Sequence, residues 1–470
     1  MTNDKQKRDL TQGPLIPQII LFTLPLIATS ILQLLFNTAD TIVVGRWGGS
    51  TPEECETALA AVGSCGSLIT LFVNLFLGLS VGAGIVVAHD IGAKRENEVQ
   101  KTVHTAVITA LVAGLLVTVL GFLTTRWALI LMGTDESVLP EATKYIYAYF
   151  CGMPANMLYN YCASILRSKG DTVRPLIFLS IAGIANVGMN LVAVLIFHWG
   201  AMGVGVATAL SQWVSCILII IYMMRMDGPC RIELSKLRLD VVKFKRIIVV
   251  GLPAGAQSML FSVSNILIQS SVNSFGPTIV AANTTASNLN NYLYASQNAL
   301  YHTTITFVAQ NAGANKYKRM KQAVLCCALV VSVVGIVLGL TMHLFSDTLL
   351  GIYSPDNPTV VMYAQVRHAM FCFTYFLCGI MEVGSGMLRA LDRSMSSMVI
   401  SLIGSCILRI IWIFTVFNWL PIENTVENTV FRMQMLYISY PITWIITSAA
   451  LYIMGFFAFR KFKREHNLLT

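Results

Sequence analysis

The sequence predicts an all-α membrane protein whose twelve transmembrane helices form two pseudo-symmetric lobes of six helices. The composition, a series of apolar stretches of spanning length and an internal duplication predict this fold. Only 12% of the 470 residues are charged and 55% are hydrophobic, whereas soluble domains average about 25% charged and about 45–50% apolar residues. The chain is therefore expected to lie in a lipid bilayer.

Two copies of one hydrophobic pattern occupy residues 19–225 and 247–460. Pro25 and Pro253 occupy the same place in the first helix of each copy, and two later motif pairs keep nearly the same separation. These pairs are AHDIGA at 88–93 with AQNAGA at 309–314, and Leu-Arg at 166–167 with Leu-Arg at 388–389. Repeats of membrane helices are the usual plan of secondary transporters, in which the substrate binds between the repeats.

Each predicted helix is an apolar stretch long enough to cross the hydrocarbon core, which takes about 20 residues. The first copy holds stretches at 16–45, 58–90, 102–125, 140–166, 173–198 and 201–224, with an insertion at 51–57 before the second. The second copy holds stretches at 247–273, 279–311, 322–345, 359–388, 395–418 and 433–459. The predicted domains are an N-terminal lobe at 1–225, a cytoplasmic linker at 226–246 with an amphipathic piece near 234–242, and a C-terminal lobe at 247–470.

Basic residues predict the orientation of the helices, because Lys and Arg resist translocation across the membrane. When the N-terminus is placed in the cytoplasm, 26 of the 32 Lys and Arg residues belong to connections on that side. The opposite loops carry acids such as Glu53 and Asp135. We therefore expect a multi-pass protein of the plasma (inner) membrane with both termini in the cytoplasm. The net charge of +9 then reflects topology, and no nucleic-acid partner is expected.

The sequence lacks the motifs of several enzyme classes. It has no GxxxxGK[ST] phosphate loop, no GxSxG nucleophile elbow and no HExxH zinc helix. The eleven cysteines form no CxxC pair and no cluster with histidine at metal-ligand spacing. We therefore expect neither an enzyme nor a bound cofactor or metal, and a secondary transporter is the class that remains.

One acid on a polar helix face is the first candidate for ion coupling. Gln33, Asn37 and Asp40 are spaced by four and three residues, so they share one face of the first helix. Asn186 and Asn190 lie one turn apart in the fifth helix, at a similar depth. These groups together suit a Na⁺ ion or a shared proton. The alternatives are an Asp40 that reaches the membrane interface and asparagines that only join neighbouring helices.

The second copy repeats the polar face without its charge, because Ile268 stands where Asp40 would be. The eighth helix is rich in amides and aromatic residues, a mixture that suits a roomy substrate cavity. The predicted substrate cleft comprises Gln33, Asn160, Asn265, Gln269, Asn291, Tyr294, Asn298 and His302.

Glu382 and Arg409 are further charges within predicted spans. Helical rise places them about 12 Å apart in depth, so separate partners are expected instead of one salt bridge. Glu382 aligns with Asn160 of the first copy and is a candidate second protonation site, or a carboxylate solvated by a vestibule. Arg409 is assigned a structural charge.

The order of several motifs resembles the multidrug and toxic compound extrusion (MATE) family, and most of all its DinF-like branch. These motifs are the paired Leu-Pro first helices, Gly-Ala after the second and eighth helices, LRSKGDTVRP and LRALDRSMSS after the fourth and tenth, and LRIIW in the eleventh. The resemblance implies two six-helix lobes around a central cleft. We expect the protein to function as a monomer. The resemblance also implies export of drug-like organic cations or amphipathic compounds by alternating access, in exchange for H⁺ or Na⁺.

The resemblance also assigns the ion site. Asp40 and Asn186 match the acid and the first amide of the DinF-like pattern, whereas Asn190 departs from it, because many members have Asp there. This loss favours H⁺ over Na⁺ without excluding either. The NorM-like pattern places acids in the seventh and tenth helices, and only Glu382 matches it. A lipid-linked saccharide flippase is the alternative function, although it should carry several basic residues in its cleft.

Overall fold

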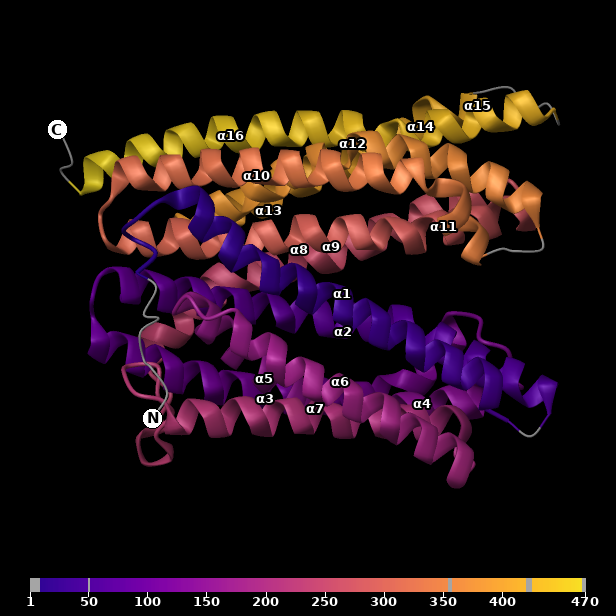
Figure 1. The fold of residues 1–470 in the computed structure, drawn as a ribbon, viewed down its shortest axis with the longest axis horizontal. Helices are drawn as coiled ribbons and strands as arrows, with labels where there is room; N and C mark the ends of the chain where they lie inside the picture. Colours follow the sequence, from indigo (N-terminus) through magenta and orange to yellow (C-terminus); the bar gives the residue numbers. More distant parts are fainter. Residues whose placement is uncertain (1–8, 50, 354–356, 420–424, 467–470) are drawn as a thin grey trace. The chain divides into compact units, whose positions relative to one another are not determined.

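A computed structural model describes residues 9–49, 51–353, 357–419 and 425–466, and over these residues the chain is helical and contains no strand (Figure 1). Every predicted span overlaps one helix or a run of consecutive helical segments. Ten helical stretches of the described residues are long and apolar enough to cross a membrane.

The helices of the first copy follow the predicted order. They are α1 (Leu15–Trp47), α2 (Pro52–Gly92), α3 (Glu96–Leu131), α4 (Leu139–Phe150), α5 (Met153–Ser168), α6 (Val173–Leu191) with a π-helical continuation (Val192–Ile196), and α7 (Gly200–Arg225). The predicted fourth span is divided between α4 and α5, and neither part alone reaches spanning length. The break lies at Gly152, where a Cβ atom would approach the Cα atom of Ala209 to 2.8 Å, and Pro154 follows in the first turn of α5.

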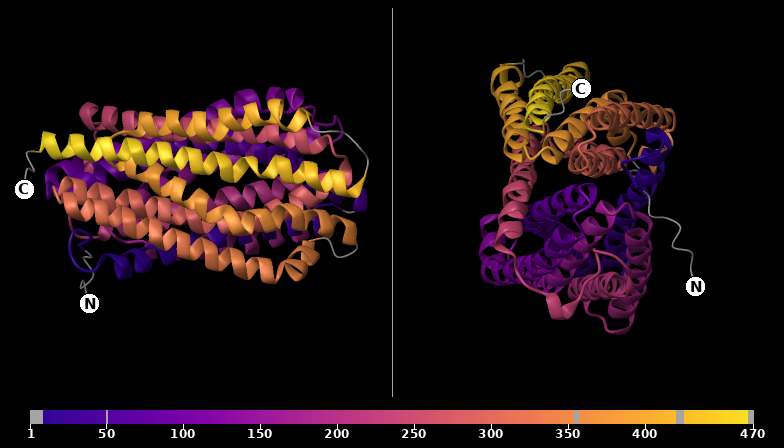
Figure 2. Two further views of the ribbon diagram at one scale, coloured as in Figure 1. Left: turned by 90° about the horizontal axis from the view of Figure 1, so that it is seen from above. Right: turned by 90° about the vertical axis from the view of Figure 1, so that its left-hand side faces the viewer.

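The second copy has the same plan with more interruptions. Its helices are α8 (Val241–Asn273), α9 (Pro277–Gly313), α10 (Tyr317–Leu344), α11 (Ser346–Tyr353), α12 (Pro358–Ala390), α13 (Ser394–Ser401) with a π-helical continuation (Leu402–Ile407), α14 (Leu408–Thr415), α15 (Val426–Tyr437) and α16 (Ser439–Glu465). Short 3₁₀ turns occupy Leu234–Lys236 and Phe417–Trp419. Figure 2 shows α16 as a long uninterrupted helix. The 37-residue α9 is not among the ten apolar stretches, because its many amides reduce its hydropathy.

The chain forms two compact units. Unit 1 contains Asp9 and residues 28–259, and unit 2 contains residues 10–27 together with the described residues from Leu260 onward. Two of the three boundaries between the units therefore fall inside α1 and α8, and the third precedes α1. The predicted domain boundaries, with lobes at 1–225 and 247–470, stay a prediction.

Glycines allow α2 and α8 to pack backbone against backbone within unit 1. A Cβ atom on Gly78 would lie 2.1 Å from the backbone nitrogen of Gly255, and one on Gly82 would lie 2.7 Å from the Cα atom of Gly251. Each helix thus presents two glycines four residues apart, which is the spacing that permits close approach of membrane helices. Packing of this kind replaces the hydrophobic effect, which contributes little between helices surrounded by lipid.

The segment that joins the two copies is attached to α3 within unit 1. The backbone nitrogen of Glu233 donates to His104 Nε2 at 3.1 Å, and Gln100 donates to the Glu233 carboxylate at 2.9 Å. Its predicted amphipathic piece contains only the 3₁₀ turn before α8 begins at Val241. Lys236 holds the pKa of the Glu233 carboxyl below its usual range by a hydrogen bond and ion pair.

Candidate functional site

A polar cavity of about 300 Å³ lies inside unit 1 among α1, α4, α5, α6 and α7. Five of the predicted residues line it, namely Gln33, Asn37, Asp40, Asn160 and Asn186. Further polar lining comes from Tyr145, Tyr149, Asn156, Thr208, Gln212 and Ser215. The structure therefore brings together groups that the sequence places on separate helices.

Asp40 is held by an amide network at this cavity. Asn190 Nδ2 donates to Asp40 Oδ1 at 2.5 Å and also lies 3.2 Å from Asn186 Oδ1. The Thr208 hydroxyl lies 3.5 Å from Asp40 Oδ2 and 3.5 Å from the amide nitrogen of Asn186. Asn190 and Asn186 are 0% and 4% exposed, so the network belongs to the interior of the helix bundle.

The chemistry of this network suits a small hard cation or a proton. Its acceptors are carboxylate, amide and hydroxyl oxygens, the ligand type that hard cations prefer. Asn190 Oδ1 is buried and has no hydrogen-bond partner among the described residues. The residues that line the cavity include no Lys or Arg, so Asp40 has no basic counterion in the lining. An intramembrane carboxylate without such a partner is expected to bind a cation or a proton.

The local fold explains why Asp40 meets the asparagines of α6. At Gly183 a Cβ atom would lie 1.8 Å from the ring of Phe36, so the absence of a side chain admits this ring and lets α1 approach α6. Asn190 follows two turns later, two residues before the π-helical segment Val192–Ile196 begins. Such local widening of a helix is frequent at functional sites.

Thr208 and Gln212 are site residues that the sequence reasoning missed. Both belong to α7 and, with Ser211 and Ser215, recur at three- and four-residue spacing. This is the same helical-face signal that singled out Asp40. The polar face of α7 is a weaker signal than the face that carries Asp40, because α7 contains no charged residue before its last turn.

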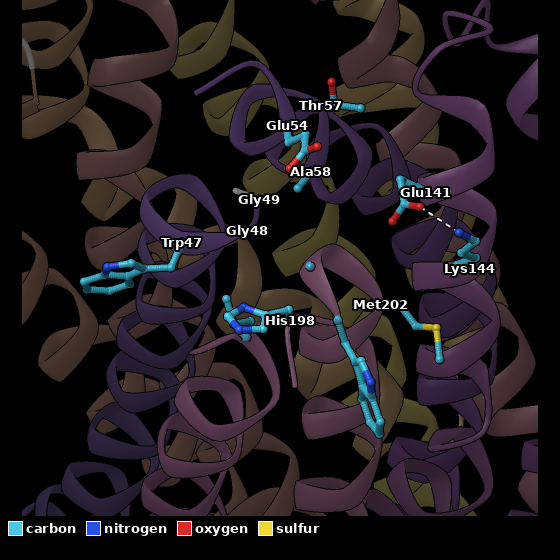
Figure 3. A pocket seen from close by; sticks show the side chains of 13 residues that line it. Trp47, Gly48, Gly49, Glu54, Thr57, Ala58, Glu141, Lys144, His198 and Met202 are labelled. Carbon is cyan, nitrogen blue, oxygen red and sulfur yellow. Dashed lines mark hydrogen bonds and ion pairs between the residues drawn. The ribbon is translucent and has the colours of Figure 1, made fainter. Parts of the chain in front are cut away.

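A second pocket of about 470 Å³ lies at the end of unit 1 where α1 finishes (Figure 3). Trp47, Glu54 and His198 line it, together with an ion pair of 2.8 Å between Lys144 and Glu141. Asp40 is not part of its lining, so this pocket is distinct from the Asp40 cavity. The sequence analysis singled out none of these residues as a site.

The predicted cleft residues of the second copy belong to unit 2. Gln269 joins Asn273 and Asn283 through amide hydrogen bonds of 3.0 Å. Several α9 amides that were not predicted are buried, and Gln297 is 0% exposed with both amide atoms unpartnered among the described residues. The other predicted residues retain partial or full exposure, namely Asn265, Asn291, Tyr294, Asn298 and His302. Their role as a substrate surface stays a prediction.

Glu382 and Arg409 form no ion pair with each other in the part of the chain that the structure describes. Arg409 donates to the Thr443 hydroxyl at 3.1 Å, and its guanidinium carbon lies 3.8 Å from the ring centre of Tyr440. Glu382 is half-buried on α12, one turn from Cys378. Their proposed roles, a second protonation site and a structural charge, stay predictions.

A duplicated bundle of membrane helices with a polar cavity inside it defines an integral membrane transporter of the repeat type. The family model described as MatE matches residues 25–192 and again residues 253–415. The two matches begin at Pro25 and Pro253, the prolines that the sequence analysis paired. The chain belongs to the MATE family of transporters, which confirms the predicted family, and the proteins of this family act as transporters and not as enzymes.

Relatives of similar length carry transporter names. The chain is 26% identical to the "Probable multidrug resistance protein YoeA" of Bacillus subtilis, over 81% of this chain and 82% of that protein. It is 25% identical to an "FAD transporter" of Shewanella oneidensis, over 85% of this chain and 87% of that protein. The family and these relatives confirm that the chain is a transporter homologue of the multidrug efflux type.

Solved structures confirm the fold class of twelve transmembrane helices in two six-helix lobes. A multidrug resistance MATE family transporter of the MOP superfamily in an outward-facing conformation gives a TM-score of 0.88 at 18% identity, over 98% of this chain and 100% of that one. A MOP superfamily transporter from Pyrococcus furiosus gives the same TM-score, identity and coverage. At this identity the likeness concerns the fold alone.

Proposed function

We propose that the protein is a secondary active antiporter that exports organic cations or other amphipathic drug-like compounds in exchange for H⁺ or Na⁺. The Asp40 network carries this proposal, because an intramembrane carboxylate that accepts from the Asn190 amide and has no basic residue in its cavity lining couples most simply to a cation gradient. The names of the multidrug resistance relatives support the substrate class.

In this proposal the protein works by alternating access as a monomer. Substrate binds from the cytoplasm, the protein turns outward, and uptake of an external cation by Asp40 promotes release. Asn190 in place of the Asp found in many members of the family makes H⁺ the favoured ion. Glu382 is a second proton acceptor, and Asn265, Gln269 and the exposed polar residues of α9 contact the substrate.

The proposed location is the inner membrane with both termini in the cytoplasm. The linker and the turn between α2 and α3 supply basic residues that support this orientation. The alternative function is a lipid-linked saccharide flippase of the same superfamily. It would need several basic residues at its substrate site to hold a phosphate group.

Replacement of Asp40 by Asn tests the coupling role. Purified protein in sealed vesicles is given a substrate panel under a pH gradient alone and under a Na⁺ gradient alone. We expect Asp40→Asn to lose exchange driven by the effective gradient while it still binds substrate. The matched control is Asp135→Asn, the same chemical change in the exposed loop between α3 and α4. Undiminished gradient-driven exchange by Asp40→Asn would reject the proposal.

A further inference from the structure

Arg367 and Arg409 of unit 2 have no acidic partner among the described residues. Arg367 belongs to α12 and Arg409 to α14, both within stretches that can span the membrane. Neither forms an ion pair with a carboxylate in the part of the chain that the structure describes. Charged side chains in membrane spans are costly unless they face a partner or a pathway, so each of these two requires an explanation.

Aromatic rings connect the two arginines. The guanidinium carbon of Arg409 lies 3.8 Å from the ring centre of Tyr440, whose ring centre is 4.9 Å from that of Phe371. The guanidinium carbon of Arg367 lies 5.0 Å from the centre of the Phe371 ring. Two rings therefore lie between two cations, in an arrangement that we call the Arg–aromatic cluster.

Further rings extend one side of this cluster. Trp444 packs against Phe371 and Tyr440 with ring centres 5.8 Å apart in each case, and Tyr375 is 5.3 Å from Trp444. Tyr375 and Tyr440 keep partial exposure, whereas Phe371 and Trp444 are buried. The aromatic part of the cluster thus consists of two partly exposed tyrosine rings packed against two buried rings.

The hydrogen bonds of the two arginines leave their positive charge uncompensated. Arg409 is 6% exposed and donates to the Thr443 hydroxyl, and Arg367 donates to Asn283 and to the Ser287 hydroxyl. All of these acceptors are neutral. The Nε atoms of Arg367 and Arg409 are both buried and have no partner among the described residues. An anion would supply the missing charge and use donors that the protein leaves free.

We propose that the Arg–aromatic cluster binds organic anions that carry an aromatic ring system and a carboxylate or phosphate group. In this proposal the ligand's ring packs against the partly exposed Tyr375 and Tyr440, and its anionic group accepts hydrogen bonds from the arginines. The inference rests on the proposed transport function and extends its substrate class from cations to aromatic anions. It assigns the anion to unit 2, whereas the coupling cation is assigned to Asp40 in unit 1.

A matched pair of probes tests this site by binding alone. Riboflavin 5′-phosphate and riboflavin share one ring system and differ in the phosphate group. Full-length protein in lipid nanodiscs is titrated with each probe by equilibrium dialysis, without any ion gradient. We expect the phosphate form to bind about tenfold more tightly or better, because two charge-assisted hydrogen bonds distinguish the probes.

Three variants complete the experiment. Arg367→Gln and Arg409→Gln should each reduce the preference for the phosphate form to about threefold or less, since each loses one charge-assisted contact. Arg432→Gln is the matched control, because Arg432 also stacks on rings of unit 2, those of Phe275 and Phe417, outside the cluster. Equal binding of the two probes by the unchanged protein, or an unchanged preference in both cluster variants, would overturn the proposal.

The Asp40→Asn variant separates this inference from the coupling mechanism. It should keep the full preference for riboflavin 5′-phosphate in the binding assay, because Asp40 belongs to the other unit. One outcome is that neither the unchanged protein nor any variant shows gradient-driven exchange, while Arg367→Gln and Arg409→Gln still reduce the preference for riboflavin 5′-phosphate. In that case the transport proposal fails and the anion site stands. If Asp40→Asn alone abolishes the preference, the anion site is wrongly assigned.

Discussion

The ammonium group of Lys243 lies 2.7 Å from the carboxylate of Asp90, and both side chains are buried. Lys243 belongs to the first turn of α8 and Asp90 to the last turn of α2. Glu98 of α3 accepts from the same ammonium at 3.0 Å, and the Thr102 hydroxyl donates to Asp90 at 3.2 Å. One buried cation therefore joins three helices at one end of unit 1.

We expect Lys243→Met to destabilise the protein by about 3 kcal/mol, because it leaves the Asp90 carboxylate buried without its cation. The double variant Lys243→Met with Asp90→Asn should recover most of this loss, since no buried charge remains. Heat unfolding of the detergent-solubilised protein gives the comparison. Lys101→Gln is the control, because Lys101 pairs with Glu98 on the exposed surface and such pairs contribute little. A double variant no more stable than Lys243→Met would contradict this account.

The facing glycines of α2 and α8 give a second prediction. Gly78→Val adds a side chain where even a Cβ atom would lie 2.1 Å from the backbone of Gly255. The helices must separate, and we expect a loss of about 3 kcal/mol or a failure to fold. Gly63→Val is the control on the same helix, because no atom lies within 4 Å of its Cβ position. Size-exclusion profiles and unfolding midpoints measure the difference, and equal behaviour of the two variants would refute the close contact.

The sequence predicted the apolar centres of the helices better than their ends. Hydrophobicity placed the seventh span at 247–273, but α8 begins at Val241 and includes Lys243. In the sequence Lys243 resembles part of the linker, because its partner Asp90 is 153 residues away. Long-range ion pairs of this kind let a helix continue through polar residues, and no local pattern reveals them.

The candidate ion site was predictable where it follows one helix face and unpredictable where it depends on packing. The spacing of Asn186 and Asn190 indicated a shared face, and the structure places both beside Asp40. Thr208 joins them only because α7 packs on α6, a contact that spacing along one helix does not encode. The Arg–aromatic cluster escaped prediction for the same reason, since its members lie on α12, α14 and α16.

Arg319 attaches the segment that precedes α1 within unit 2, which yields a third prediction. Its guanidinium donates to the backbone carbonyls of Leu10, Gln12 and Gly13 at 2.7–3.3 Å, and Lys316 donates to the Thr11 carbonyl at 2.7 Å. We expect Arg319→Gln to accelerate amide hydrogen exchange in residues 10–18 by about tenfold or more, because several charge-assisted bonds are lost. Lys318→Gln, a change at an exposed neighbour, should leave the exchange unchanged. Equal protection in both variants would show that Arg319 does not stabilise this segment.

Addition of a second acid to the Asp40 network should shift the ion preference of the transporter. Asn190 Nδ2 lies 2.5 Å from Asp40 Oδ1, so Asn190→Asp would place two carboxylates in contact. Two carboxylates in contact repel each other unless they share a proton or bind a cation. At an effective dielectric constant of 20, the Coulomb attraction between an added negative charge and Na⁺ at 4 Å is about 4 kcal/mol. After the cost of desolvation we expect Na⁺-driven exchange to require about tenfold less Na⁺ than in the unchanged protein. Transport in vesicles, measured against external Na⁺ at fixed pH, gives the half-saturating concentration.

Asn160→Asp, in the same cavity but bonded to Asn156, is the control and should cause a smaller change. An equal or larger change in the control would show that any acid in the cavity suffices, and that Asp40 and Asn190 do not form the ion site.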